Sequence, residues 1–222
     1  MKSKAMPIRP LLLGHRGARG EKSIAENTLA SFDLAIASGC DGFEFDVRLS
    51  ADGQPVICHD AKSRGHEVAR SKADALGLPL LAAVLTRYGR TAFLDIELKV
   101  PGLESALLLA LREFPPKKEF VVSSFLPEVL ADLRVRSQSV PLGIICDQKK
   151  QLAQARKLDV QYVISQHSLI DKKLVQDLHT AERKIFAWTV NDKKSMLRLA
   201  DWGVDGIISD DTELLVRTFQ GV

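Results

Sequence analysis

The chain has 222 residues, of which 45% are hydrophobic and 27% charged, and its formal net charge is +3 at pH 7. These values are ordinary for a globular protein, and the length suffices for one large domain with a sizeable core. The lysine pairs are scattered and not clustered with aromatic residues, so nothing indicates a nucleic-acid partner. No apolar run approaches the length of a transmembrane helix.

The N-terminus and the cysteines indicate a cytoplasmic protein. The apolar run Leu11–Leu13 is too short for the hydrophobic region of a signal peptide, and a glycine follows it directly. Cys40, Cys58 and Cys146 are far apart and show neither metal-binding nor redox spacing. We expect them to be reduced and buried, as in a reducing compartment.

Short apolar runs alternate with amphipathic stretches along the whole chain. The runs predict eight strands, at 10–14, 42–47, 92–98, 119–124, 142–146, 162–165, 185–190 and 206–209. The stretches between them predict helices at 26–38, 80–90, 103–113, 127–136, 147–158, 171–182, 192–200 and 212–219. Pro127 suits a first helical turn, and Asp171 and Asp192 suit N-cap positions.

Strict alternation of strand and helix predicts a parallel sheet covered by helices. Eight such units in 222 residues predict a closed, TIM-type (β/α)8 barrel that forms a single domain over residues 1–222. An open, doubly wound sheet is the alternative, because alternation alone does not prove closure.

A β-hairpin extension is predicted after the second strand. Asp52-Gly53 is a strong signal for a two-residue turn, because both residues tolerate positive φ. Such a turn places Asp46 directly opposite His59, and the alternation of side chains puts Glu44 on the same face as Asp46. The strand at 56–59 lies too close in sequence for a parallel crossover, so we expect it outside the barrel.

Polar side chains recur at the predicted C-terminal ends of the strands, where barrels of this type carry their active sites. In chain order they are His15, Arg16, Glu44, Asp46, Glu97, Lys99, Ser123, Ser124, Trp188, Asn191, Ser209 and Asp210. A buried charge is costly unless it is paired or bound to a metal, so this pattern indicates a functional site. For Glu97 and Lys99, a structural ion pair is the alternative.

Three of these residues form a candidate metal site. Glu44, Asp46 and Glu97 offer oxygen donors with no soft ligand nearby, a set that suits Mg²⁺ or Ca²⁺. Arg16 and Lys99 add positive charge at the same rim. Carboxylates, a divalent ion and two cations together predict a phosphate ligand.

Two histidines complete the predicted chemistry. His15 and His59 can supply a base and an acid at a phosphodiester. Asn27 and Trp188 are candidates to line the substrate pocket. For Asn27 the alternative is a role in capping the first helix, and for Trp188 it is filling of the barrel.

The chain resembles the glycerophosphodiester phosphodiesterase family over almost its whole length and in the family's motif order. The motifs are G-H-R-G at 14–17, E-N-T at 26–28, E-F-D at 44–46, D-G at 52–53, H-D at 59–60, I-E-L-K at 96–99, S-S-F at 123–125, W-T-V-N at 188–191 and D-G-I-I-S-D at 205–210. The resemblance implies a TIM-type barrel and metal-dependent hydrolysis of glycerophosphodiesters to an alcohol and glycerol 3-phosphate.

The resemblance also implies roles for individual residues: acid–base catalysis for His15 and His59, metal ligation for Glu44, Asp46 and Glu97, and phosphate contact for Arg16 and Lys99. It leaves open which histidine is the acid, and whether water or a substrate hydroxyl attacks first.

Some positions depart from the family pattern. Asp95 stands where Asn is frequent, and Ser209 stands where Thr is usual. The segment at about 61–77 is short where many members carry a longer capping insertion. We therefore expect an open mouth that admits bulkier head groups or lysophospholipids.

Two other functions remain open at this point. A lysophospholipase D or a phospholipase C-like phosphodiesterase could use the same barrel. A phosphate-ligand-binding barrel without catalysis would have lost a histidine or a metal ligand, and none is lost here.

Overall fold

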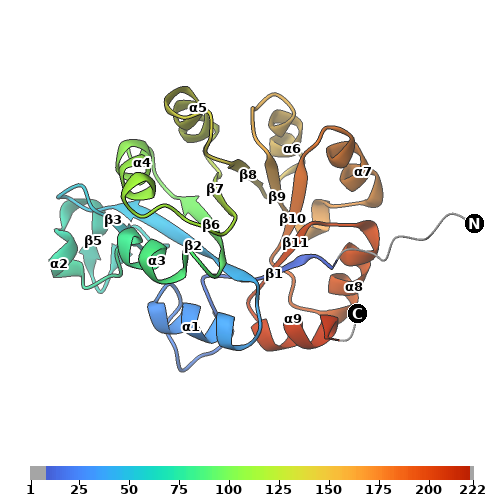
Figure 1. The fold of residues 1–222 in the computed structure, drawn as a ribbon, viewed down its shortest axis with the longest axis horizontal. Helices are drawn as coiled ribbons and strands as arrows, with labels where there is room; N and C mark the ends of the chain where they lie inside the picture. Colours follow the sequence, from blue (N-terminus) through green and yellow to red (C-terminus); the bar gives the residue numbers. More distant parts are fainter. Residues whose placement is uncertain (1–8, 221–222) are drawn as a thin grey trace, which may run out of the picture.

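The structure is a computed structural model that describes residues 9–220. Its centre is a ring of parallel strands surrounded by helices (Figure 1). The ring contains β1 (Leu11–Gly14), β2 (Gly42–Leu49), β6 (Phe93–Leu98), β7 (Phe120–Ser124), β8 (Leu142–Cys146), β9 (Tyr162–Gln166), β10 (Lys184–Trp188) and β11 (Gly206–Ser209). Since β1 pairs with both β11 and β2, the ring is closed. The predicted TIM-type barrel is confirmed, and the open sheet is wrong.

A helix follows each ring strand. In chain order these are α1 (Leu29–Ala37), α3 (Leu81–Tyr88), α4 (Glu104–Glu113), α5 (Pro127–Arg136), α6 (Lys149–Ala155), α7 (Lys172–Thr180), α8 (Lys193–Trp202) and α9 (Thr212–Phe219). Asp171 and Asp192 accept hydrogen bonds from backbone amides as N-caps of α7 and α8, and Pro127 occupies the first turn of α5. These three predicted helix starts are confirmed.

The start of α1 differs from its prediction for a backbone reason. Asn27 has φ +57°, in the left-handed region, so the helix cannot extend back to residue 26. Thr28 is the N-cap and accepts a hydrogen bond from the Ser31 amide. The capping role is therefore carried by Thr28, and the side chain of Asn27 is available for another contact.

Side chains on the ring strands alternate between two apolar regions. One faces outward onto the helices, and Phe32 and Phe43 stack there with ring centroids 4.3 Å apart. The other fills the inside of the barrel and contains Leu13, Phe93, Val121, Ile145, Tyr162, Ile164, Phe186 and Ile208. Because Phe93 points inward, residues 95 and 97 on the same strand point inward too, nearer the C-terminal end.

The hairpin after β2 exists, but its predicted register is wrong by one residue. β3 (Pro55–Ile57) runs antiparallel to β2 with Val47 opposite Ile57, and the Cys58 amide donates to the Asp46 carbonyl. Asp46 is therefore opposite Cys58 and not His59. The loop has three residues, 51–53, and of these only Gly53 has positive φ, at +76°. This matches a type I turn followed by a left-handed residue, not the two-residue turn we expected.

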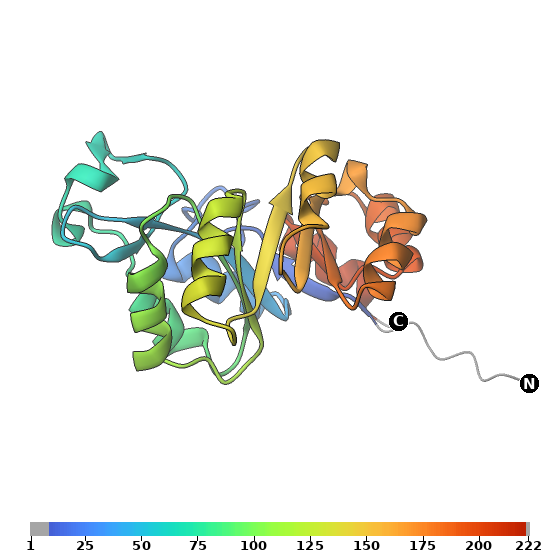
Figure 2. The same ribbon diagram turned by 90° about the horizontal axis from the view of Figure 1, so that it is seen from above.

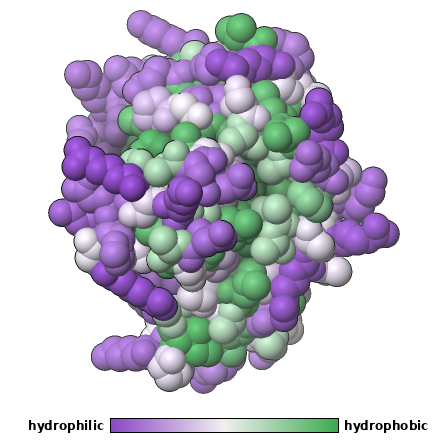
Figure 3. All heavy atoms as spheres, turned by 90° about the vertical axis from the view of Figure 1, so that its left-hand side faces the viewer, coloured by the Kyte–Doolittle hydropathy of each residue, from purple (hydrophilic) through white to green (hydrophobic). Residues whose placement is uncertain are grey.

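The segment after β3 projects from one side of the barrel in two perpendicular views (Figures 1 and 2). It contains the two-stranded β4 (Lys62–Ser63) and β5 (His66–Glu67), a 3-10 turn η1 (Val68–Arg70) and α2 (Ala73–Leu76). A small apolar cluster anchors it: Val56, Cys58, Val68, Ala73 and Leu76. Figure 3 shows this side of the molecule, where hydrophobic residues lie among hydrophilic ones.

Two further sequence predictions concern the cysteines and membrane insertion. Cys40, Cys58 and Cys146 are free and buried, as expected. Within residues 9–220, no helix combines the length and apolar character needed to cross a membrane.

Candidate active site

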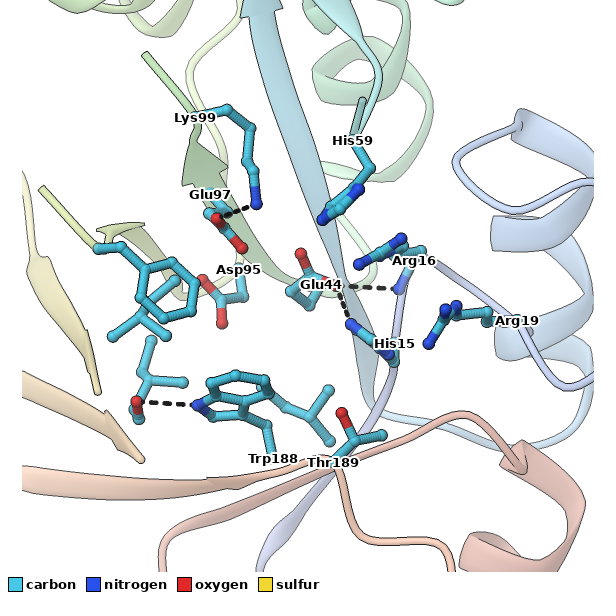
Figure 4. A pocket seen from close by; sticks show the side chains of 14 residues that line it. His15, Arg16, Arg19, Glu44, His59, Asp95, Glu97, Lys99, Trp188 and Thr189 are labelled. Atoms are coloured by element: carbon cyan, nitrogen blue, oxygen red, sulfur yellow. Dashed lines mark hydrogen bonds and ion pairs between the residues drawn. The ribbon is translucent and has the colours of Figure 1, made fainter. Parts of the chain in front are cut away.

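A cavity of about 260 Å³ opens at the C-terminal ends of the ring strands. Side chains from β2 and β6, from the loop after β1 and from the segment after β3 line it, together with aromatic residues beyond β7 and at the end of β10. Figure 4 shows the arrangement, with Glu44 in the middle, Glu97 and Lys99 on one side and His15 and Arg16 on the other. The cavity therefore brings together residues that lie far apart in the sequence.

Glu44, Asp46 and Glu97 form one cluster of carboxylates. Each offers an oxygen, and these oxygens lie within 4.8 Å of one another. The register explains the grouping, because Asp46 on β2 is paired with Glu97 on β6, and Glu44 lies one pleat below Asp46. All three side chains are buried.

The loop between β1 and α1 fixes two of these carboxylates. The Arg16 amide donates to Glu44 Oε2 at 2.9 Å, from a residue whose φ is +52°. The Asn27 side chain donates to Asp46 Oδ2 at 2.8 Å, and its own oxygen accepts from the Asp46 amide at 3.3 Å. Arg16 and Asn27, which both have positive φ, thus donate hydrogen bonds to the cluster, and Asn27 is itself buried.

The cluster holds an excess of buried negative charge. Burial, reinforced by the nearby carboxylates of Asp46, Glu97 and Asp95, raises the pKa of Glu44 well above its ordinary value. Burial and the charge of Asp46 raise the pKa of Glu97 to about 7, although Lys99 opposes the shift. Burial likewise raises the pKa of Asp95 to about 7, against the hydrogen bond from Ser123.

These carboxylates fit a divalent cation. Glu44 Oε1 and Asp46 Oδ1 are buried and accept no hydrogen bond from any described residue. Buried carboxylate oxygens without donors are costly, and coordination of a cation would relieve that cost. An all-oxygen donor set is the chemistry that hard divalent ions prefer.

The two predicted cations, Lys99 and Arg16, lie against the cluster and form ion pairs with its carboxylates. Lys99 Nζ donates to Glu97 Oε1 at 2.5 Å and lies 3.3 Å from Asp46 Oδ1. Arg16 Nη1 donates to Glu26 at 2.6 Å, and Arg16 Nε lies 3.3 Å from Asp46 Oδ2. The Glu97–Lys99 ion pair considered from the sequence is therefore present, and it lines the same cavity as the histidines.

The two predicted histidines both line this cavity. His15 Nδ1 is 2.7 Å from Asp210 Oδ1, while its Nε2 lies 3.8 Å from Glu44 Oε2. His59 reaches the cavity although its predicted register is wrong, because the chain leaves the ladder after Cys58. Its Nδ1 is 2.8 Å from Asp60 Oδ1.

Asp210 is a site residue to which sequence reasoning assigned no role. Burial alone would raise its pKa, but hydrogen bonds with His15 and Asn191 and the charges of His15 and Arg19 lower the pKa to about 2. It follows β11 directly, and this position at a strand end was the available signal. Arg19, which also lines the cavity, carried no signal in the sequence.

The wall opposite the histidines is apolar. Phe125 and Trp188 meet edge to face with ring centroids 5.7 Å apart, and Ile145, Ile164 and Ile208 complete this part of the lining. The Trp188 indole donates to the Ile164 carbonyl at 3.1 Å, which fixes the ring. Trp188 lines the cavity and also packs against the apolar side chains inside the barrel, so both of its sequence interpretations stay open.

Comparison with known proteins identifies the family. The model of the glycerophosphoryl diester phosphodiesterase family matches residues 15–87 and 88–214. The chain belongs to this family. It is thus an enzyme of the phosphoric diester hydrolase class, and the family's reaction is the hydrolysis of glycerophosphodiesters.

Relatives and solved structures agree over nearly the whole chain. The glycerophosphodiester phosphodiesterase of Caldanaerobacter subterraneus subsp. tengcongensis is 30% identical over 239 residues, covering 95% of this chain and 98% of that protein. A phosphodiesterase of Oleispira antarctica, solved with the product sn-glycerol-3-phosphate, has a TM-score of 0.84 at 27% identity, covering 96% of this chain and 97% of that one. A glycerophosphodiester phosphodiesterase of Parabacteroides distasonis, at 21% identity, has a TM-score of 0.83 and covers 96% of each chain.

Proposed function

We propose that this enzyme hydrolyses glycerophosphodiesters to glycerol 3-phosphate and an alcohol, using a divalent ion and His15 and His59 as an acid–base pair. The main support is that both histidines, the two predicted cations and two of the three carboxylates, Glu44 and Glu97, line one cavity. Oxygens of these two carboxylates and of the buried Asp46 lie within 4.8 Å of one another. The product in the related Oleispira antarctica structure supports the choice of substrate.

The residues divide into three tasks. Glu44, Asp46 and Glu97 would hold the ion, which when bound supplies a Lewis acid for a phosphoryl oxygen. Arg16 and Lys99 would neutralise the remaining phosphate charge. We propose that the ion is Mg²⁺ or Ca²⁺, since both prefer oxygen ligands.

The histidines would move the protons. The contact with Asp210 favours the tautomer of His15 that carries its proton on Nδ1, so that Nε2 is free to accept a proton. Asp60 can orient His59 in the same way. One imidazole would accept a proton from the nucleophile while the other donates to the leaving alkoxide.

Two measurements test this assignment. Replacement of His15 or His59 by Ala should lower kcat by about 10²- to 10⁴-fold while the folded structure is retained. Chelation should abolish turnover, and one of the two ions should restore it. Wild-type turnover in either histidine variant, or full activity in excess EDTA, would contradict the proposal.

We also propose that residues 61–77 are a short capping segment of a single barrel domain and leave the mouth accessible to bulky head groups or lysophospholipids. In support, no residue of 61–77 lines the cavity in the described structure. A panel of glycerophosphocholine, glycerophosphoinositol and a lysophospholipid tests the range. Turnover of only the smallest diesters would count against an open mouth.

A cytoplasmic location is part of the proposal. It is supported by the three cysteines, which are free and buried as expected in a reducing compartment. Fractionation of source cells with an antibody against the protein tests it, and recovery outside the cytoplasmic fraction would contradict it.

A further inference from the structure

Asp95 is a buried carboxylate in the cavity to which the proposed mechanism gives no task. It lies on β6, one pleat below Glu97 and one pleat above Phe93, and so at the boundary between the charged rim and the apolar barrel interior. Its residue exposure is 0%, yet it lines the cavity. Figure 4 shows it between Glu97 and the Trp188 wall.

One oxygen of this carboxylate has a hydrogen-bond partner among the described residues, and the other has none there. Ser123 Oγ donates to Asp95 Oδ1 at 2.6 Å. Asp95 Oδ2 is buried and receives no hydrogen bond from any residue in the described range 9–220, and no ion pair there involves Asp95. A buried acceptor of this kind costs about 1–3 kcal/mol unless a donor reaches it.

Among the described residues, neither the other carboxylates nor the apolar wall supplies that donor. Asp95 does not belong to the carboxylates whose oxygens lie within 4.8 Å of one another, so it stands apart from the candidate metal ligands. The apolar wall offers no free donor, since the Trp188 indole is already bonded to the Ile164 carbonyl. The phosphate oxygens of a substrate are hydrogen-bond acceptors, so they do not supply a donor either. A hydroxyl in the organic part of a ligand can supply the donor.

We propose that Asp95 is a specificity-determining residue whose free oxygen accepts a hydrogen bond from a hydroxyl of the substrate's glycerol moiety. The inference rests on the proposed function, because it assumes that a glycerophosphodiester occupies this cavity. The apolar wall beside Asp95 would then pack against the carbon chain that carries the hydroxyl.

A hydroxyl fits better than an ammonium group of the alcohol moiety. Recognition of an ammonium by aromatic residues needs ring faces, and Lys99 Nζ already lies 5.7 Å from the centroid of the Phe125 ring. Phe125 also meets Trp188 edge to face, which is not the arrangement of an open aromatic cage. A neutral donor needs only the carboxylate oxygen.

The test combines variants with substrate analogues. Asp95→Ala should lower kcat/KM for glycerophosphocholine by about 10- to 100-fold. For one analogue that lacks a glycerol hydroxyl, at C1 or at C2, the same substitution should change kcat/KM by no more than about twofold, because the lost contact is already absent. Asp95→Asn keeps a hydrogen-bonding side chain and should recover most of the activity.

The controls separate this role from a structural one. Ser123→Ala removes the contact to the other oxygen and should affect the full substrate and both analogues equally. Equal losses for Asp95→Ala on all three substrates would overturn the inference. A loss of kcat/KM that disappears on glycerophosphomethanol but persists on the deoxy analogues would also overturn it, because the partner of Asp95 would then be the ammonium group. An Asp95→Asn variant as impaired as Asp95→Ala would overturn it too.

Binding distinguishes this inference from the proposed function. Calorimetric titration of glycerol 3-phosphate into the wild type and Asp95→Ala, with Mg²⁺ present, should show about 10-fold or greater weakening in the variant. If the wild type binds this ligand through Asp95 but hydrolyses no diester, the proposed function fails while the inference holds. Hydrolysis by the wild type with equal affinity in the variant would overturn the inference alone.

Discussion

Glu97→Gln should stabilise the metal-free protein at alkaline pH while it weakens metal binding. Burial and Asp46 raise the pKa of Glu97 from 4.5 to about 7 in the folded protein. Between these two pH values the folded state binds more protons at this group than the unfolded state does. The free energy of unfolding therefore falls as pH rises through this window and stays low above it. Glutamine remains neutral and escapes that loss.

The magnitude follows from the size of the shift. A rise from 4.5 to about 7 corresponds to about 3 kcal/mol, at about 1.4 kcal/mol for each pKa unit. In a chain of 222 residues this should raise the melting temperature of the variant by about 6–12 °C at pH 8. At pH 5 wild-type Glu97 is already protonated when folded, so most of the difference should vanish. Lys99 Nζ also lies 3.3 Å from Asp46 Oδ1, a contact that the substitution does not remove.

Thermal unfolding in EDTA at pH 5 and pH 8 measures this difference. The matched control is Glu113→Gln, an exposed position at the end of α4 where no such pH-dependent gain is expected. Added Mg²⁺ or Ca²⁺ should stabilise the wild type more than the variant. A variant no more stable than the wild type at pH 8, or a gain of equal size at both pH values, would refute the reasoning.

Three further outcomes are expected. Asn27→Ala should weaken metal affinity about 10- to 100-fold in calorimetry, because Asp46 loses the hydrogen bond that positions it. The control Thr28→Ala should lower the free energy of unfolding by only about 1 kcal/mol, through the lost N-cap. Unchanged metal affinity in Asn27→Ala would contradict this. Asp210→Asn should lower kcat at least about 10-fold with little change in KM, and the opposite split would argue against orientation of His15. Metal binding at pH 7 should release protons in a weakly buffered solution, because the pKa values of Glu44 and Glu97 are raised; no release would mean that these groups are not the ligands.

Local signals in the sequence were sufficient for the strand and helix pattern. The predicted ranges 127–136, 142–146, 206–209 and 212–219 match α5, β8, β11 and α9 at both ends. These elements have strong start signals or continuous apolar runs bounded by polar residues, and such signals act over a few residues. The alternation of eight strands with helices then left few architectures, and the closed barrel was the expected one.

Backbone conformation at single residues was less predictable. Asp52-Gly53 has the composition of a two-residue turn, yet it forms part of a three-residue loop in which Asp52 Oδ1 also accepts from the Ala73 amide at 3.0 Å. That contact comes from a segment about twenty residues away, so no local rule contains it. The start of α1 was also not predictable, because it depends on the left-handed φ of Asn27.

For the site, composition and order along the chain were enough to propose which residues take part. Carboxylates, histidines and cations at successive strand ends must meet if the barrel closes, because all parallel strands end at the same rim. The tertiary structure alone decided how they meet. It placed Asn27 against Asp46 and Asp210 against His15, and among residues 9–220 it left one oxygen of Asp95 without a donor. Hydrogen bonds between distant segments depend on side-chain positions that local sequence does not specify.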